Sequence, residues 1–326
     1  AFRLPRPVLD IEIQAIENSG VSIQTEITVP SAKALLDDGF NAVLLAAGTQ
    51  ADLQLNIPGE DLPGVNSCVN FLRAVNLHGS ANIGPKTVVI GAGNSAMDAA
   101  RTALRLGAEQ VTVVGIERED ELPAHPREVR EAREEGIELK LGTAPIAFEG
   151  AAALERIVCR AAHWQQDADG ALNIAYDDDE TFSIEADCVI VAIGQRPQLK
   201  ECGLDKEIET GAGGRISIDD AHATSAQNIF AAGDVTTGPS TVVEAMAAGR
   251  EAAGSIIERL TGQSSPFEKI SVETRGVGDY ADIPESLLSR RRPDVPQRLP
   301  QVRCRDFDEV DMGLGTEEAV TEARRC

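Results

Sequence analysis

The chain has 326 residues, which is long enough for two domains of ordinary size. Its 53 acidic residues outnumber 30 basic ones, and the resulting net charge of −23 argues against nucleic acid and anionic membranes as partners. The sequence contains no run of about 18 apolar residues, so it predicts no membrane insertion.

Two similar segments, Phe40–Leu55 and Ala186–Glu201, flank the middle of the chain. Each contains an apolar strand that ends in Ala-x-Gly and continues into a polar turn. Internal likeness of this kind indicates either two related domains or two equivalent crossings between domains.

Between these segments lies a glycine-rich motif at Thr87–Gly107. An apolar strand ends at Ile90, Gly91, Gly93 and Ala96 follow at G-x-G-x-x-A spacing, and a helical pattern begins at Ala96. The first glycine permits a tight turn, the second lets a pyrophosphate approach the backbone, and the alanine allows close packing of helix and strand. The free N–H groups of the helix then bind phosphate. We expect a dinucleotide here; the alternative is a tight turn without a ligand.

A second strand, Val111–Val114, completes a βαβ unit and is followed by Ile116, Glu117 and Arg118. An acidic residue at this position accepts hydrogen bonds from the ribose 2′-hydroxyl, whereas an arginine binds the 2′-phosphate of NADP. Glu117 therefore favours NAD, while Ala96 and Arg118 are also compatible with NADP. A solvated loop glutamate is the alternative interpretation of Glu117.

The pattern then predicts a helix over Pro126–Glu135 and a strand over Ile137–Leu141. Two further strands, Arg156–Ala161 and Ala171–Tyr176, are expected to pair in antiparallel fashion through a turn at Asp167–Gly170.

After the second crossing, Ile229–Ala232 is a short apolar strand that ends abruptly at Gly233 and Asp234. Ser240 or Thr241 is the expected N-cap of a helix over Val242–Leu260. An acidic strand end opposite a helix N-terminus predicts a second cofactor crevice, and an ordinary strand–helix junction is the alternative.

From Ser264 onward the chain is rich in proline and is expected to be largely irregular, apart from a short helix over Thr316–Arg325. The six cysteines and four histidines show neither C-x-x-C nor metal-ligand spacing, so no redox disulfide and no complete metal site are expected within the chain. Scattered cysteines of this kind fit a cytoplasmic location.

Together these features resemble flavoproteins with two dinucleotide domains, and in particular the small subunit of glutamate synthase and related FAD/NAD(P)-dependent pyridine nucleotide oxidoreductases. The resemblance extends over Phe2–Cys326 and is carried by Phe2–Ile13, Ala42–Thr49, Ile57–Val65, Val88–Ala108, Leu122–Leu139, Val189–Pro197 and Ile229–Ala253.

The resemblance implies an α/β fold with two Rossmann-like domains, in which the NAD(P) domain is inserted into the FAD domain. The expected parts are a first FAD segment (1–81), the NAD(P) domain (82–185), a second FAD segment (186–264) and a C-terminal tail (265–326).

The resemblance also assigns cofactor contacts. The NAD(P) loop comprises Gly91, Gly93, Asn94, Ser95 and Ala96. Gly233 and Asp234 approach the ribityl and phosphate part of FAD, and Thr241 and Val242 lie at the pyrimidine edge of the flavin. Gly48 and Thr49 line the same groove, and Gly194 lies on the crossing that returns to the flavin domain.

This sequence departs from the family pattern at three places. The family usually carries paired arginines where this chain has Ile116 and Glu117, which strengthens the expectation of NAD. Relatives have an FAD-binding glycine motif upstream of the segment matching Phe2, so we expect a fragment that lacks the first FAD βαβ unit. In relatives the motif ending at Cys326 continues into iron–sulfur ligands, so Cys326 is either the first ligand of such a motif or an ordinary free thiol.

The implied function is electron entry: a hydride passes from NAD(P)H to FAD, and electrons continue to iron–sulfur clusters in a larger oxidoreductase subunit or an iron–sulfur protein. Hydride transfer between stacked rings needs no protein acid or base, so no catalytic side chain is predicted. The alternatives are a self-contained NAD(P)H–flavin reductase and a non-catalytic nucleotide-binding scaffold.

Overall fold

The computed structural model describes residues 2–166, 172–177, 179–199, 204–264 and 291–324. These residues belong to two compact units, one formed by residues 24–267 and the other by residues 1–23 together with 268–326. The predicted turn at Asp167–Gly170 and the terminal Cys326 lie outside the described residues. The four-part domain division expected from the sequence stays a prediction.

The larger unit is built on a five-stranded parallel sheet. Its strands, in order across the sheet, are β3 (Val65–Ser67), β11 (Cys188–Val191), β4 (Lys86–Ile90), β5 (Gln110–Val114) and β6 (Glu138–Lys140). The central strands are continuous apolar runs because both faces of the sheet are covered. The strands predicted from the glycine motif are thus confirmed.

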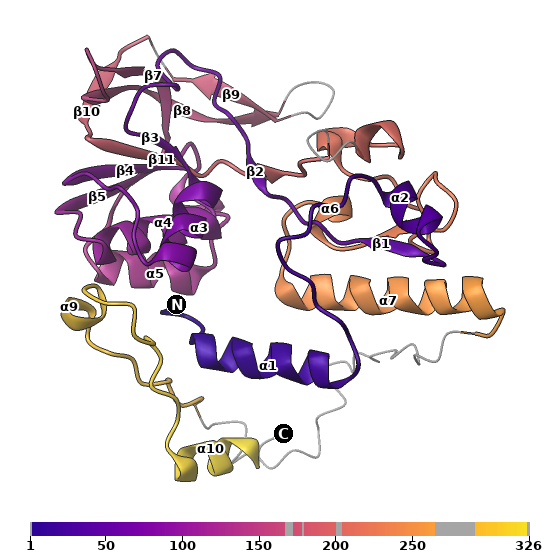
Figure 1. Ribbon diagram of the computed structural model, residues 1–326. Coiled ribbons are helices and arrows are strands. Elements are labelled where there is room, and N and C mark those ends of the chain that lie inside the picture. The colour runs from indigo at the N-terminus through magenta and orange to yellow at the C-terminus, as the bar shows by residue number, and fades with distance from the viewer. Residues whose placement is uncertain (1, 167–171, 178, 200–203, 265–290, 325–326) are drawn as a thin grey trace. The chain divides into compact units, whose positions relative to one another are not determined.

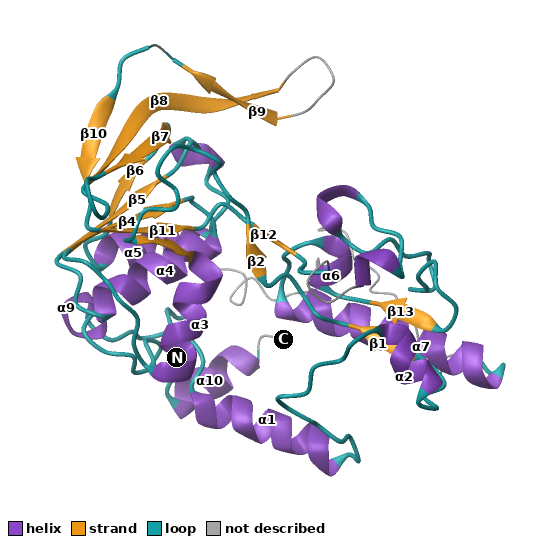
Figure 2. Cartoon of the chain, turned by 45° about the horizontal axis from the view of Figure 1, so that its top comes forward, coloured by secondary structure: helices purple, strands orange, loops and turns teal. Residues whose placement is uncertain are grey.

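Helices cover one face of this sheet and antiparallel strands cover the other (Figures 1 and 2). The helices are α3 (Cys68–His78), α4 (Asn94–Arg105) and α5 (Pro126–Glu134), and the strands are β7 (Thr143–Glu149), β8 (Arg156–Gln166), β9 (Leu172–Tyr176) and β10 (Phe182–Glu185). Side chains of β7 and β8, including Phe148 and Ile157, pack against Val88 and Val189 of the parallel sheet in one core.

A second, smaller sheet pairs β1 (Val43–Leu45) with β13 (Ile229–Ala231) in parallel. The helical segments around it are α2 (Ala32–Asp37), η2 (Leu204–Lys206), η3 (Ala212–Gly214), α6 (Asp234–Thr237) and α7 (Val242–Thr261). Buried apolar side chains, among them Val43, Ile229 and Val235, form a separate core here. We call residues 24–48 and 204–264 the β1–β13 lobe.

The two similar segments of the sequence meet between these sheets. β2 (Ala51–Asp52) follows the first Ala-x-Gly turn, β12 (Gln195–Arg196) follows the second, and the two strands pair in antiparallel fashion. The internal likeness indicated either two related domains or two equivalent crossings. The structure contains the two crossings, which run between the sheets.

The smaller unit contains α1 (Arg6–Asn18), α9 (Pro300–Arg303) and α10 (Thr316–Ala323). Its N-terminal and C-terminal parts are joined where the Val310 N–H donates to the Phe2 carbonyl at 3.1 Å. Arg298 forms a bidentate ion pair with Asp306, with N–O distances of 2.6 and 2.7 Å. The predicted helix at Thr316 is present and ends two residues earlier than expected.

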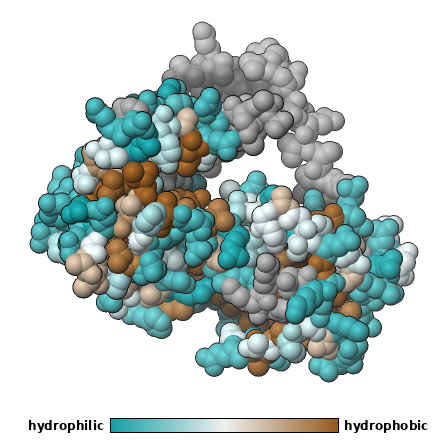
Figure 3. Space-filling model, turned by 90° about the horizontal axis from the view of Figure 1, so that it is seen from above, coloured by the Kyte–Doolittle hydropathy of each residue, from teal (hydrophilic) through white to brown (hydrophobic). Residues whose placement is uncertain are grey.

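The surface view in Figure 3 is mostly hydrophilic, in keeping with a chain in which 25% of residues are charged. Within the part of the chain that the structure describes, no helix is both long and apolar enough to cross a membrane.

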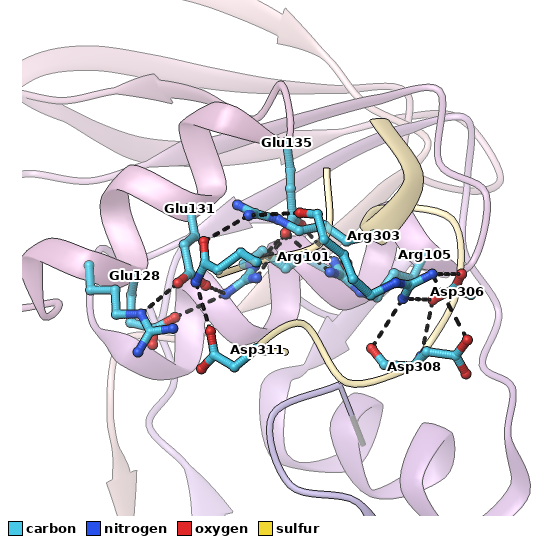
Figure 4. A network of polar contacts seen from close by, with 12 residues as sticks. Arg101, Arg105, Glu128, Glu131, Glu135, Arg303, Asp306, Asp308 and Asp311 are labelled. Carbon is cyan, nitrogen blue, oxygen red and sulfur yellow. Dashed lines mark hydrogen bonds and ion pairs between the residues drawn. The ribbon is translucent and has the colours of Figure 1, made fainter. Parts of the chain in front are cut away.

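Helices α4 and α5 are joined by buried ion pairs (Figure 4). The Arg105 guanidinium donates to the Glu135 carboxylate at 2.6 Å, and Arg101 donates to the same carboxylate at 2.8 Å. Arg101 also pairs with Glu131 at 2.9 Å and with Glu128 at 3.1 Å. Burial alone would raise the pKa of Glu135, but the hydrogen bonds from both arginines outweigh it and lower the pKa to about 2.

We expect Glu135→Gln to lower the free energy of unfolding by about 3 kcal/mol at neutral pH, because it removes the buried carboxylate charge that Arg101 and Arg105 share. Since the pKa of Glu135 is depressed from 4.5 to about 2, its stabilising contribution is complete above pH 4.5 and is lost as the pH falls toward 2. Urea unfolding measured across this range should therefore show a flatter pH dependence for the variant. The exposed Glu109→Gln is the matched control and should behave like the wild type; an equal loss in both variants would contradict the prediction.

Candidate functional site

Gly91 closes the turn after β4 and is required there by packing. Its φ is +117°, and its N–H donates to the Val114 carbonyl at 2.8 Å. A Cβ at this position would stand 2.3 Å from the carbonyl oxygen of Ala192, just beyond the end of β11. The glycine therefore allows the ends of two adjacent parallel strands to approach each other.

Gly93 has a different environment. It is the N-cap of α4 with extended backbone angles, and a Cβ built on it meets no atom within 4 Å. No side chain caps this helix, and its first hydrogen bonds to the Gly93 carbonyl are made by the N–H groups of Ala96 and Met97. Open space over Gly93 thus adjoins a helix N-terminus that no side chain caps, which is the arrangement that binds phosphate.

The remaining residues of the predicted loop hold it in place. The Asn94 side-chain oxygen accepts from the His125 N–H at 2.8 Å, which fixes the segment that leads into α5. The Ser95 carbonyl lies 3.7 Å from the Cys68 Sγ of α3, and Ala96 is fully buried against the sheet. Helix α4 begins at Asn94, two residues before the predicted start, because Gly93 already provides the N-cap.

Glu117 lies beside this loop, beyond the end of β5. Its Oε2 is buried and has no hydrogen-bond partner among the described residues. That oxygen and the Cβ of Ala92 both lie within 2.9 Å of the point where a Cβ would stand on Gly115. The structure thus brings Glu117 next to the glycine loop, where its free oxygen can accept a hydrogen bond. Arg118 is exposed, and its N–H donates to the Glu121 carboxylate at 3.3 Å.

The second predicted crevice lies at the end of β13. Gly233 has a φ of +75° and precedes α6, and the Asp234 carboxylate accepts from the Ser240 hydroxyl at 2.6 Å. Thr241, one of the two predicted N-caps, caps α7 and forms a reciprocal capping box with Glu244. Val242 is 76% exposed at the first turn of this helix.

Gly48, Thr49 and Gly194 lie on the paired crossings. Gly48 has a φ of +66° and Gly194 a φ of +129°. The hydroxyl of Thr49, which is buried, donates to the Gln195 side chain at 3.2 Å, and the Leu53 N–H donates to the Gly194 carbonyl at 2.9 Å. The structure therefore places Thr49 beside the second crossing, next to Gly194. The cofactor contacts expected of Gly48, Thr49 and Gly194 stay a prediction.

The sequence did not identify a cavity of about 250 Å³ beside the crossings. It is lined by residues of β2, the ends of β3 and β11, and the start of α3, including Asp52, Ser67, Asn70 and Val191. No cofactor contact is expected at any of these residues from the sequence, so only the fold reveals the cavity.

Three of the described thiols are buried in a way that does not suit redox chemistry. Cys68, Cys159, Cys188 and Cys304 are free. Burial raises the pKa of both Cys68 and Cys159 to about 12 and also raises the pKa of Cys188, so these three remain protonated at neutral pH. No cluster of three or more metal-ligating side chains occurs among the described residues. The predicted ligand Cys326 lies outside them.

A model of the pyridine nucleotide-disulphide oxidoreductase family matches residues 8–249. The NADP(+)-dependent formate dehydrogenase subunit beta of Moorella thermoacetica is 36% identical over 100% of this chain and 48% of its own length. The glutamate synthase (NADPH) small chain of Escherichia coli K12 is 32% identical over 80% of this chain and 59% of its own length. This chain thus spans about half the length of these curated relatives.

Solved structures share the fold. FprA from Mycobacterium tuberculosis in complex with NADPH has a TM-score of 0.61 and 22% identity, over 72% of this chain and 68% of its own. Thioredoxin reductase from T. acidophilum has a TM-score of 0.52 and 22% identity, over 67% of this chain and 66% of its own. This likeness confirms the predicted α/β fold class.

Proposed function

The chain belongs to the pyridine nucleotide-disulphide oxidoreductase family, and from this premise we propose that it is the electron-entry module of a larger oxidoreductase. It binds NADH at the Gly91–Ala96 loop and FAD at the β1–β13 lobe, and electrons leave through iron–sulfur clusters in other segments or in a partner subunit. The names of the relatives, a formate dehydrogenase subunit and a glutamate synthase small chain, support a role within a larger assembly.

The observation that carries this proposal is the open space over Gly93 at the uncapped N-terminus of α4. Gly91 differs, because a side chain there would collide with backbone. Packing therefore accounts for the glycine at position 91, whereas Gly93 leaves room for a ligand. A pyrophosphate placed there accepts hydrogen bonds from free N–H groups and interacts favourably with the helix dipole.

The residues of the β1–β13 lobe fit a flavin nucleotide. Gly48 and Gly233 both have positive φ, and both follow the carboxyl ends of paired parallel strands. Ligands of open α/β sheets bind outside these strand ends. FAD, when bound, supplies the acceptor for the hydride; the contribution of this chain is to bind, to orient and to exclude water.

A reductase that passes electrons to a disulfide is a weaker candidate. Such an enzyme needs a reactive thiol, and burial keeps Cys68, Cys159 and Cys188 protonated. A scaffold that binds nucleotide without turnover would retain the glycine loop and differ only in its failure to reduce flavin.

Anaerobic titration of the FAD-supplemented chain with NADH tests this proposal. We expect the flavin absorbance to bleach with one NADH per bound flavin, because hydride transfer is a two-electron step. Saturable binding of NADH to chain that carries bound flavin, without bleaching of that flavin, would contradict the electron-entry role and favour the scaffold.

Within this function we propose that NADH is preferred over NADPH. Glu117 places a carboxylate oxygen without a partner beside the glycine loop, where a ribose hydroxyl can donate to it. A 2′-phosphate at the same place would meet like charge, which costs several kcal/mol. The names of the relatives mention NADP(+) and NADPH, so this preference distinguishes the chain from them.

Equilibrium titration should give at least a roughly tenfold lower dissociation constant for NADH than for NADPH. Replacing Ile116 and Glu117 together by arginine should make NADPH the more tightly bound cofactor, since guanidinium groups bind phosphate. Glu117→Gln is the control, because it removes the negative charge without adding a phosphate-binding group. It should only reduce the difference between the dissociation constants of NADH and NADPH. Equal or tighter binding of NADPH by the wild type would refute the assignment of Glu117.

A further inference from the structure

The cavity beside the crossings is lined by the Asp52 carboxylate, of which only one oxygen has hydrogen-bond partners among the described residues. Asp52 Oδ2 accepts two hydrogen bonds, one from the Ser67 hydroxyl and one from the Val69 N–H at 2.8 Å. Asp52 Oδ1 is buried and has no partner among the described residues. A buried carboxylate oxygen without a donor is costly, and such an atom at a cavity wall indicates a ligand that donates to it.

The cavity lies one strand away from the glycine loop. Val191, which lines it, is the last residue of β11 and pairs with Ile90, the residue before Gly91. On the other side, Cys68 at the start of α3 contacts the carbonyl of Ser95 in α4. The cavity and the loop therefore share the carboxyl edge of the parallel sheet.

The unpartnered oxygens of Asp52 and Glu117 lie on opposite sides of β4, the strand that leads into the glycine loop. Glu117 follows β5, which pairs with one edge of β4, whereas the cavity adjoins β11, which pairs with the other edge. A dinucleotide crosses a parallel sheet at the point where the strand order reverses, with one nucleoside on each side. If Glu117 receives the adenosine ribose, the cavity receives the nicotinamide.

We propose that Asp52 is the positioning residue for nicotinamide, and that its Oδ1 accepts a hydrogen bond from the carboxamide NH₂ of the ring. The proposal rests on NAD(H) binding at the glycine loop. The cavity suits this ring because it combines the apolar Val191 with amide and hydroxyl side chains, among them Asn70 and Ser67. Asp52 lies on a crossing, between the two dinucleotide sites, where the ring must be oriented for hydride transfer.

Asp52→Asn is the informative substitution. An asparagine can keep its oxygen toward Ser67 and Val69, so that the cap of α3 is preserved, while its NH₂ replaces the free oxygen. The variant thereby exchanges an acceptor for a donor within the cavity. Asp61→Asn is the matched control, because Asp61 is exposed and is not among the residues lining the cavity.

Calorimetric titration with three ligands separates the possible outcomes. NAD⁺ carries the carboxamide, 3-acetylpyridine adenine dinucleotide keeps the carbonyl but lacks the NH₂, and ADP-ribose lacks the ring. We expect the wild type and Asp61→Asn to bind NAD⁺ about tenfold more tightly than the acetyl analogue, as for a hydrogen bond to a charged group. Asp52→Asn should bind NAD⁺ and the acetyl analogue with similar affinity, while its affinity for ADP-ribose stays that of the wild type.

Retention of the wild-type preference by Asp52→Asn would overturn the assignment of Asp52. An equal loss of affinity for all three ligands would also overturn it, because it would indicate only a structural role. Failure of the wild type to bind ADP-ribose would instead refute nucleotide binding at the glycine loop, and with it the proposed function.

Discussion

The close approach of β4 and β11 at Gly91 is the constraint on which the rest of the site depends. The backbone of Ala192 occupies the place of a side chain on Gly91, so the two strand ends can adjoin only if this residue is glycine. The turn at Gly91 leads into α4, whose N-terminus no side chain caps, and the second crossing starts immediately beyond β11. The proposed dinucleotide site and the return of the chain to the β1–β13 lobe thus both adjoin this one packing contact.

Charge explains how an acidic chain can bind an anionic ligand. In the proposed function the pyrophosphate is bound by backbone N–H groups at a helix N-terminus, which carry partial positive charge whatever the side chains are. The carboxylates of Glu117 and Asp52 are then free to accept hydrogen bonds from the uncharged hydroxyl and amide groups of the ligand. In the same domain, Glu135 is compensated by Arg101 and Arg105, so its charge stabilises the α4–α5 packing.

Local patterns predicted local structure well. The helix expected over Val242–Leu260 ends at Thr261, and the strand expected over Ile229–Ala232 ends at Ala231. Strand β8 runs five residues beyond its predicted end, to Gln166, because pairing with β9 extends it.

Asp52 could not be predicted, because its contacts with Ser67 and Val69 depend on the crossing that carries it to the start of α3. Glu117 was identified because its position is fixed by sequence distance from the glycine motif.

The most direct test of the account is NADH binding by the Gly93→Val variant, measured beside its melting temperature. The valine side chain points into open space in the free protein, so the fold should be preserved, but it occupies the place assigned to the pyrophosphate. The account predicts a melting temperature close to that of the wild type and no measurable affinity for NADH. Undiminished NADH affinity in a stably folded variant would show that the glycine loop is only a structural turn.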